Sequence, residues 1–177
     1  SIIVLIMIMF YVVANMVWLK VVNNNIDEYL EFYKYVKSNM KEPSWLGEFS
    51  LNELKNVLNN EGKLFNFYDN NIIVCSMLYI PSNNKTLEKH NLKYDEKLVG
   101  SCGPIMVNPK YVGNKFQKQM LELLDKYCKS IGKRYIFTKV HPDNIYSINN
   151  FVSDGYKFVE TYKTSSGEPR SVYFKEI

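Results

Sequence analysis

The stretch from residue 105 to residue 156 alternates strand-like and helix-like patterns, and this order limits the possible folds more than any other part of the chain. A short apolar strand at residues 105–107 leads into a turn at residues 108–115. A helix should follow, because apolar residues recur there at helical spacing: Phe116, Met120, Leu123, Leu124, Tyr127, Cys128 and Ile131. Gly132 stands where a left-handed C-terminal cap is expected.

A second strand and a second helix complete this segment. Residues 135–140 are apolar and β-branched enough to form a strand, and residues 141–144 then open a helix that should end at Gly155. Asn144 has the side chain of a good N-cap. The segment therefore predicts the order strand, turn, helix, strand, helix.

The turn before the first of these helices favours an anion. A helix N-terminus presents unpaired backbone N–H groups and the positive end of the helix dipole. Gly113 lies in the turn, and Lys110, Lys115 and Lys118 add positive charge beside it. The pattern predicts a phosphate site at this helix start. A solvated, lysine-rich helix start is the alternative reading.

The whole segment resembles the acyl-CoA-binding half of the GNAT-type N-acetyltransferases. The resemblance lies in residues 107–117 and 140–144, and in Ser147, Asn150, Phe151, Gly155 and Tyr156. In that family the first run is the pyrophosphate loop, and the second opens the helix beside the pantetheine arm. The resemblance implies an α/β fold with a mixed sheet, in which two splayed central strands are flanked by helices.

The other elements follow an order compatible with this family. Strands are predicted at residues 17–22, 64–68, 72–80 and 98–107, with a closing hairpin at residues 156–162 and 170–175. Helices are predicted after Asn25 or Asp27, and after a capping box at Ser50 that Gly62 should close. Residues 81–97 are interpreted as a polar loop. Gly103 and Pro104 inside a strand predict a bulge or a kink.

The first residues of the chain are unusually apolar, since residues 1–19 carry no charged residue. We divide the chain into an apolar N-terminal segment of uncertain role, residues 1–15, and a GNAT-like acetyltransferase domain, residues 16–177. The segment could add a packed strand or a partner contact, such as a homodimer interface. Met16 could instead be the natural start of the protein. A membrane anchor is disfavoured, because the apolar run is short for a transmembrane helix and is interrupted by Asn15.

Composition excludes several classes of function. The net charge of +4 is mild and is not gathered in one basic arm, so we expect no nucleic-acid partner. The three cysteines are far apart in sequence, which favours a reducing compartment and hence the cytoplasm. The two histidines have no ligand-like spacing, so no metal site is expected.

The resemblance implies transfer of an acetyl group from acetyl-CoA to a primary amine by direct attack, without a covalent intermediate on the protein. The acceptor would be a small-molecule or peptide amine. The resemblance assigns acetyl-CoA, as co-substrate, to eleven positions: Ile105, Met106, Val107, Val112, Gly113, Asn114, Lys115, Phe116, Gln117, Asn144 and Ser147.

The turn departs from the family pattern at two of these positions. Lys115 replaces a small residue, and Val112 stands where arginine is common. Lys115 would crowd the phosphates unless its stem points outward, in which case its ammonium could pair with them.

The catalytic groups are less clear, because Phe151 stands where many members have a tyrosine that protonates the leaving thiolate. Substitute acids are Tyr146, Tyr173 or Asn150, and substitute bases are Glu48, Asp95 or Glu96. Cys102 is interpreted as a buried thiol, because no histidine is near it in sequence. The alternative function is a non-catalytic module of the same fold that binds CoA or another ligand as a sensor or partner surface.

Overall fold

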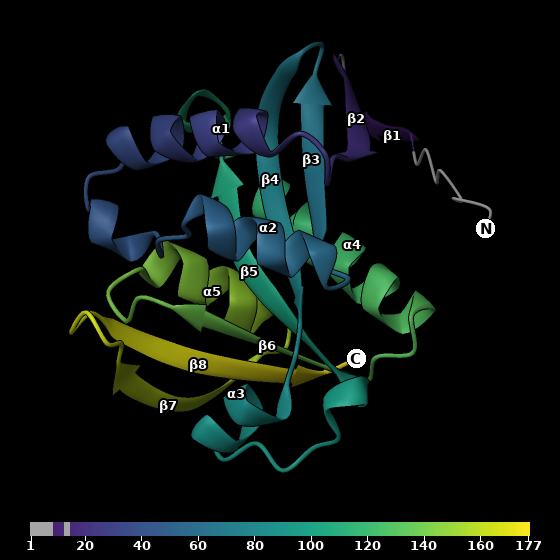
Figure 1. Ribbon diagram of the computed structural model, residues 1–177. Coiled ribbons are helices and arrows are strands. Elements are labelled where there is room, and N and C mark those ends of the chain that lie inside the picture. The colour runs from purple at the N-terminus through teal and green to yellow at the C-terminus, as the bar shows by residue number, and fades with distance from the viewer. Residues whose placement is uncertain (1–8, 13–14) are drawn as a thin grey trace.

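A computed structural model describes residues 9–12 and 15–177 and shows one mixed β-sheet with helices on both faces (Figure 1). Eight strands make up the sheet in the described residues, in the order β1-β2-β3-β4-β5-β6-β8-β7. Their bounds are β1 Met9–Val12, β2 Asn15–Val21, β3 Lys63–Asp69, β4 Ile72–Pro81, β5 Val99–Val107, β6 Tyr135–Val140, β7 Lys157–Lys163 and β8 Pro169–Glu176. Neighbouring strands are antiparallel except β5 and β6, which are parallel.

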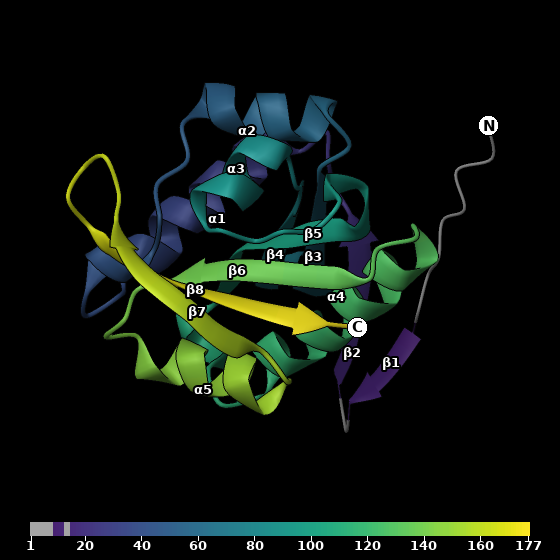
Figure 2. The same ribbon diagram turned by 90° about the horizontal axis from the view of Figure 1, so that it is seen from below.

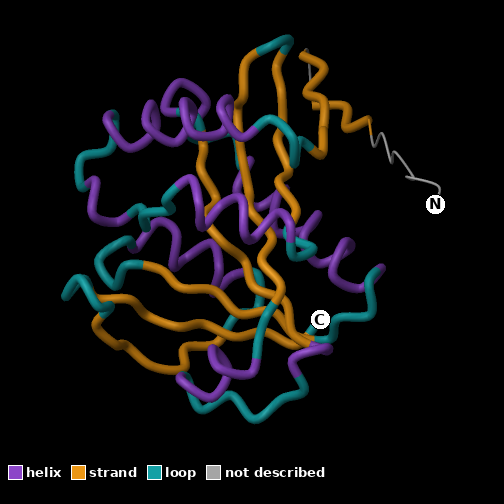
Figure 3. The backbone as a smooth tube through the Cα atoms, in the orientation of Figure 1, coloured by secondary structure: helices purple, strands orange, loops and turns teal. Residues whose placement is uncertain are grey.

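Helices cover both faces of this sheet (Figures 2 and 3). The α-helices are α1 Ile26–Ser38, α2 Leu51–Asn59, α3 Asn84–Lys89, α4 Phe116–Ser130 and α5 Ile145–Ser153, with 3-10 turns at η1 Pro43–Trp45, η2 Glu96–Leu98 and η3 Pro109–Tyr111. Helices α1, α2 and α3 lie on one face, and α4 and α5 lie on the other (Figure 2). This arrangement confirms the α/β fold with a helix-flanked mixed sheet.

Alternation along the strands divides the core between the two faces. On β3, Leu64 packs with Tyr29 of α1 and Leu54 of α2, whereas Phe65 and Phe67 belong to the core under α4. Successive strand residues point to opposite faces, so a strand buried on both sides is apolar almost throughout. The core is therefore two apolar layers, one on each side of the sheet.

Most of the expected elements are confirmed, and so are several capping signals, although Asn25, the N-cap of α1, makes no side-chain capping bond. Ser50 forms a complete capping box with Glu53 at the start of α2. Gly132 and Gly155 have positive φ angles of 79° and 93° after α4 and α5. The prediction is wrong for one residue of the apolar α4 face: Ile131 is the C-cap and its side chain is 43% exposed. The helix ends one residue too early to bury it.

Two further expectations need correction. Glu61, with φ of 66°, adopts the left-handed conformation after α2, and Gly62 instead allows a close approach. A Cβ at Gly62 would lie 2.5 Å from the backbone oxygen of Val57. Residues 81–97 are not only a loop, because they contain α3, in which Asn83 accepts a hydrogen bond from the N–H of Thr86. Six residues are too few for a clear apolar period.

Part of the apolar N-terminal segment joins the sheet. The strand β1 pairs with β2 in an antiparallel register that places Met9 opposite Trp18. Residues 1–8 and 13–14 lie outside the described residues. None of the helices in the described ranges is both long enough and apolar enough to cross a membrane.

The two central strands separate partway along their length, as expected. The β5–β6 pairing runs from Val99–Tyr135 to Cys102–Thr138 and stops there, although β5 continues to Val107. The side-chain hydroxyl of Thr138 donates a hydrogen bond of 3.1 Å to the backbone oxygen of Cys102. This bond satisfies the last carbonyl before the strands diverge.

A bulge on β5 lies at the same place, which confirms the reading of Gly103 and Pro104. The β4–β5 register passes from Tyr79–Cys102 to Met77–Ile105, so that two β5 residues oppose one residue of β4. A Cβ at position 103 would lie 2.7 Å from the backbone oxygen of Leu78. Glycine is therefore required by the close approach of β4.

A buried lysine ties the last strand to the two helices beneath the sheet. Lys175 of β8 places its Nζ 2.6 Å from a carboxylate oxygen of Asp125 in α4 and 2.6 Å from one of Asp154, the C-cap of α5. Burial raises the pKa of Asp125, and the hydrogen bond from Lys175 lowers it. The lysine thus holds two carboxylates together that would otherwise repel each other.

Replacing this lysine should destabilise the protein. We expect K175M to lower the free energy of unfolding by about 3 kcal/mol, because it leaves two carboxylates partly buried without a cation. Without Lys175 the pKa of Asp125 in the folded protein rises further. Protonation of this carboxyl at lower pH then removes a buried negative charge and stabilises the variant. The difference in the free energy of unfolding between wild type and K175M, measured by urea denaturation, should therefore become smaller as the pH falls from about 7 to about 5. Substitution of the exposed Lys157 with methionine is the control, and an equal loss in both variants would contradict the prediction.

Candidate functional site

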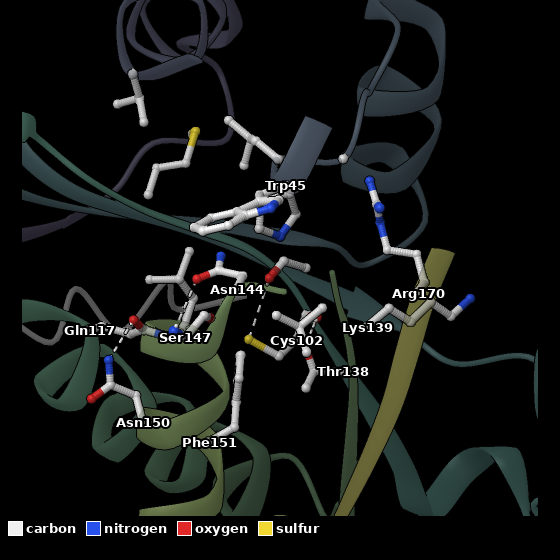
Figure 4. Close-up of a pocket in the computed structure, with 18 of the residues that line it drawn as sticks. Trp45, Cys102, Gln117, Thr138, Lys139, Asn144, Ser147, Asn150, Phe151 and Arg170 are labelled. Carbon is white, nitrogen blue, oxygen red and sulfur yellow. Dashed lines mark hydrogen bonds between the residues drawn. The ribbon is translucent and has the colours of Figure 1, made fainter. Parts of the chain in front are cut away.

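A large cleft opens where β5 and β6 diverge (Figure 4). Its volume is about 1450 Å³, and its walls come from the α1–α2 connection, β5, β6, the start of α4, α5 and the β7–β8 hairpin. Segments far apart in sequence therefore meet around the gap between two strands. Ten of the eleven predicted cofactor residues line it: Ile105, Met106, Val107, Val112, Gly113, Lys115, Phe116, Gln117, Asn144 and Ser147.

The free edge of β5 offers backbone donors to this cleft. The N–H of Asn108 donates to the oxygen of Val74 on β4 at 2.9 Å. N–H groups alternate between the two edges of a strand, so those of Ile105 and Val107 point away from β4. Beyond Cys102, β6 no longer pairs with that edge. Met106 differs, because its side chain is buried with the core under α1 and α2.

The turn after β5 is anchored on the sheet. The side chain of Asn108 accepts a hydrogen bond from the N–H of Lys110 and donates one to the oxygen of Ile73. The hydroxyl of Tyr111 donates to a carboxylate oxygen of Asp69 at 2.8 Å. These contacts fix the turn against the β3–β4 hairpin and so set where α4 begins.

The start of α4 is open to solvent and has an unusual backbone. Gly113 has a φ of 91°, and Lys115, the N-cap of α4, has a φ of 59° and makes no side-chain capping bond. Lys115 is exposed at the edge of the cleft. Asn114, the eleventh predicted residue, does not line the cleft, and its side chain donates to the oxygen of Tyr111. The first N–H groups of α4 lack a side-chain cap, as in helix starts that bind anions.

A row of amide and hydroxyl groups joins α4 to α5. Gln117 donates to the hydroxyl of Ser147 at 3.0 Å and accepts from the side chain of Asn150 at 2.8 Å. The side chain of Asn144 accepts from the N–H of Ser147 and caps α5, as predicted. This row is neutral and presents hydrogen-bonding groups along one side of the cleft.

The middle of the cleft is apolar. Phe151 is 3% exposed and packs edge-on against Tyr156, with 5.1 Å between the ring centroids. Cys102 is buried, which confirms its reading as a buried thiol, and burial raises the pKa of that thiol. Neither residue supplies an acid at ordinary pH.

The candidate acids and bases are scattered. Tyr146 lines the cleft and is 80% exposed, whereas Tyr173 packs in the core beside Phe158 and does not reach the cleft. Glu48 lies on the wall, but its hydrogen bond of 2.7 Å from Lys37 lowers its pKa and so weakens it as a base. Asp95 and Glu96 instead accept backbone hydrogen bonds near α3 and η2, away from the cleft.

The opposite wall of the cleft contains residues that were not predicted from the sequence. Trp45 stacks near the ring of His141, and Arg170 donates to the oxygen of Ser44 at 2.9 Å. Lys139, Tyr162 and Glu168 line the same region. These residues come from four separate segments, so no local pattern brings them together. Tyr162, Glu168 and Arg170 share one signal, the charged and polar composition of the closing hairpin. Within residues 9–12 and 15–177, no group of three or more His, Cys, Asp or Glu side chains could hold a metal ion.

Comparison with known proteins identifies the fold. No family model matches the sequence, and no curated protein matches it. A GNAT-family acetyltransferase from Streptococcus pneumoniae matches with a TM-score of 0.69 and 12% identity, covering 91% of this chain and 99% of that one.

Two further solved structures carry cofactor or substrate information in their descriptions. A putative acetyltransferase from Salmonella typhimurium with its cofactor acetyl-CoA matches with a TM-score of 0.65 and 11% identity, covering 90% and 93%. The ribosomal-protein-S18-alanine N-acetyltransferase from Escherichia coli matches with a TM-score of 0.64 and 15% identity, covering 92% and 94%. The chain therefore has the fold of the GNAT-type N-acetyltransferases.

Proposed function

We propose that this protein is an N-acetyltransferase that transfers an acetyl group from acetyl-CoA to a primary amine by direct attack. One observation carries the proposal: the β5–β6 pairing stops at Cys102 and Thr138, and the N–H groups of Ile105 and Val107 then face the open cleft. Free amides on a strand edge can pair with an extended ligand as a further strand would. The amide-bearing pantetheine arm is a ligand of that kind.

The phosphates of the same co-substrate would bind at the start of α4. The turn at Gly113 and Lys115 exposes the first N–H groups of the helix, and Lys110, Lys115 and Lys118 provide positive charge. Asn144 and Ser147, together with Gln117, would contact the arm between the phosphates and the thioester. The acetyl-CoA bound to the Salmonella typhimurium protein of this fold supports the same assignment.

Catalysis in this cleft would depend mainly on positioning. Holding an amine beside a thioester can supply much of the rate, because the reaction becomes effectively unimolecular. A backbone N–H of β5 would stabilise the negative charge that develops on the acetyl oxygen. With Phe151 in the middle of the cleft, the thiolate would leave by taking a proton from water or from Tyr146.

The acceptor is proposed to be a small-molecule or peptide amine. The ribosomal-protein-S18-alanine N-acetyltransferase of this fold supports a peptide among the alternatives. The three cysteines are free and buried, which suits a reducing cytoplasm. The second candidate function is a module that binds acetyl-CoA without turnover, and Phe151 is the observation that favours it.

Acetyl-CoA should stabilise the protein through the turn at Gly113. At about a hundredfold excess over its dissociation constant, acetyl-CoA should add about 2.7 kcal/mol, measured as a rise in Tm. G113V should remove this shift, because valine strains a turn that has a φ of 91°. G132V is the matched control, since Gly132 also has a positive φ but lies at the far end of α4. A full shift in G113V would place the anion site elsewhere.

Lys115 should have opposite effects on stability and on affinity. K115G should stabilise the ligand-free protein by about 1 kcal/mol, because glycine adopts a φ of 59° without strain. The same change should weaken acetyl-CoA binding, because it removes a charge beside the phosphates. Thermal melts and calorimetric titration separate the two effects. K118G, inside the helix, should instead destabilise the protein by about 1 kcal/mol. An unchanged affinity of K115G for acetyl-CoA would mean that Lys115 does not contact the phosphates.

Restoring a tyrosine at position 151 should raise turnover. A positioned acid typically contributes about 10² to 10⁴ in rate, so F151Y should increase kcat with little change in acetyl-CoA affinity. Release of free CoA thiol, measured against a panel of amines, checks this expectation. An unchanged kcat would mean that another group already protonates the thiolate, and Y146F would test the candidate. If neither protein acetylates any amine while both bind acetyl-CoA, the binding module is the better account.

A further inference from the structure

Two cations lie together on the wall of the cleft that β6 and the β7–β8 hairpin form. Lys139 of β6 is opposite Val172 of β8, and Arg170 precedes Val172 by two residues. Residues two apart on a strand share a face, so Lys139 and Arg170 are diagonal neighbours on the same face of the sheet. Tyr162 of β7 is opposite Arg170 and lies on that face as well. All three line the cleft.

These cations have no carboxylate partner among the described residues. No carboxylate lies within 4.0 Å of the Lys139 ammonium or the Arg170 guanidinium in residues 15–177. Arg170 donates to two backbone oxygens, those of Pro169 and Ser44. Lys139 has its ammonium near the aromatic rings of Phe137 and Tyr162, at 5.8 Å and 5.7 Å from their centroids.

Neighbouring groups increase the positive potential of this wall. The ammonium of Lys89 lies over the ring of Tyr162, 4.7 Å from its centroid. Desolvation lowers the pKa of Lys139, and Lys89 lowers it further. Four acids lie on this side of the cleft or beside it: Glu160 is 2.7 Å from His90, Glu168 is 3.9 Å from His141, Glu48 pairs with Lys37, and Glu42 lines the α1–α2 connection. Lys139, Arg170 and Lys89 therefore form a group of cations without an ion-pair partner among the described residues, and an anionic ligand could pair with them.

We propose that the acceptor of this protein carries an anionic group, a carboxylate or a phosphate, in addition to its primary amine, and that Lys139 and Arg170 bind that group. The inference rests on the proposed acetyl transfer. Lys139 directly follows Thr138, the residue at which the β5–β6 pairing ends. An acceptor held by its anion at Lys139 would thus place its amine near the gap between the strands.

The position of the cations separates them from the side of the cleft assigned to acetyl-CoA. Figure 4 shows Lys139 and Arg170 on one side of Cys102 and Thr138, and Gln117, Asn144, Ser147 and Asn150 on the other. The phosphates of the co-substrate have their own basic site at the start of α4. The start of α4 would therefore bind the phosphates of acetyl-CoA, and Lys139 and Arg170 would bind the anion of the acceptor. The thioester and the amine would then lie between these two sites.

The first test compares three short primary amines: propylamine, β-alanine and O-phosphoethanolamine. Release of CoA thiol gives kcat/KM for each. A charge-assisted bond typically corresponds to about 10- to 100-fold in binding, so we expect one anionic amine to exceed propylamine by about tenfold or more. β-Alanine and O-phosphoethanolamine separate a carboxylate site from a phosphate site. Equal kcat/KM for all three amines would overturn the inference.

The second test changes the wall. K139Q and R170Q should each reduce about tenfold the ratio of kcat/KM for the anionic amine to kcat/KM for propylamine. K139E should make propylamine the better substrate. K157Q removes a charge of the same sign from the other end of β7 and serves as the matched control. An unchanged ratio in K139Q, R170Q and K139E would overturn the inference. So would a loss of acetyl-CoA affinity in K139Q as large as its loss of acceptor preference.

A binding measurement separates this inference from the proposed function. Propylamine, β-alanine and O-phosphoethanolamine are titrated into the CoA-saturated protein, and binding is followed by tryptophan fluorescence, to which Trp45 in the cleft contributes. If no amine is acetylated, the proposed reaction fails, but tighter binding of an anionic amine than of propylamine would still support the anion site. If CoA does not bind, the same titration is made on the protein alone, and tighter binding of an anionic amine than of propylamine would again support the anion site. Equal binding of the three amines would overturn the inference.

Discussion

The early end of the β5–β6 pairing is the constraint on which the rest of the structure depends. Parallel strands that separate inside a protein leave backbone N–H and C=O groups without partners, and such groups are costly when they are buried. The chain satisfies the last carbonyl, that of Cys102, with the hydroxyl of Thr138. The bulge at Gly103 redirects β5 away from β6. The remaining donors then face an open cleft, where a ligand can pair with them.

The other elements hold this gap open and place chemistry around it. Helix α4 starts after β5 and α5 starts after β6, so both helix N-termini point toward the same region of the cleft. The row from Gln117 to Asn150 fixes the two helix starts relative to each other. At the back of the sheet, Lys175 joins β8 to Asp125 and Asp154. Packing therefore keeps the strands apart at one end while ion pairing and hydrogen bonding hold their surroundings in place.

Local signals predicted the elements well and the acceptor wall poorly. The period of α4, the cap at Asn144 and the bulge at Gly103 are each readable from a few neighbouring residues, and the structure confirms them. Glu61 was not predicted in place of Gly62, because glycine is the usual residue with a positive φ after a helix, whereas here glycine is required by its close approach to Val57. Lys139 and Arg170 are far apart in sequence, and only the pairing of β6 with β8 brings them together. No sequence window contains that information.

The two sides of the cleft differ in charge, and this difference bears on how an amine would react without a dedicated base. One side presents neutral amides and backbone N–H groups, and the other presents Lys139 and Arg170. A nearby positive charge lowers the pKa of an ammonium group, because it disfavours a second cation. In the proposed reaction, an acceptor with a single anionic charge would leave part of the positive charge of Lys139, Arg170 and Lys89 unbalanced, and this remainder would raise the fraction of acceptor present as free amine. The same residues would then select the substrate and favour its reactive form, which reduces the need for a carboxylate base near β5.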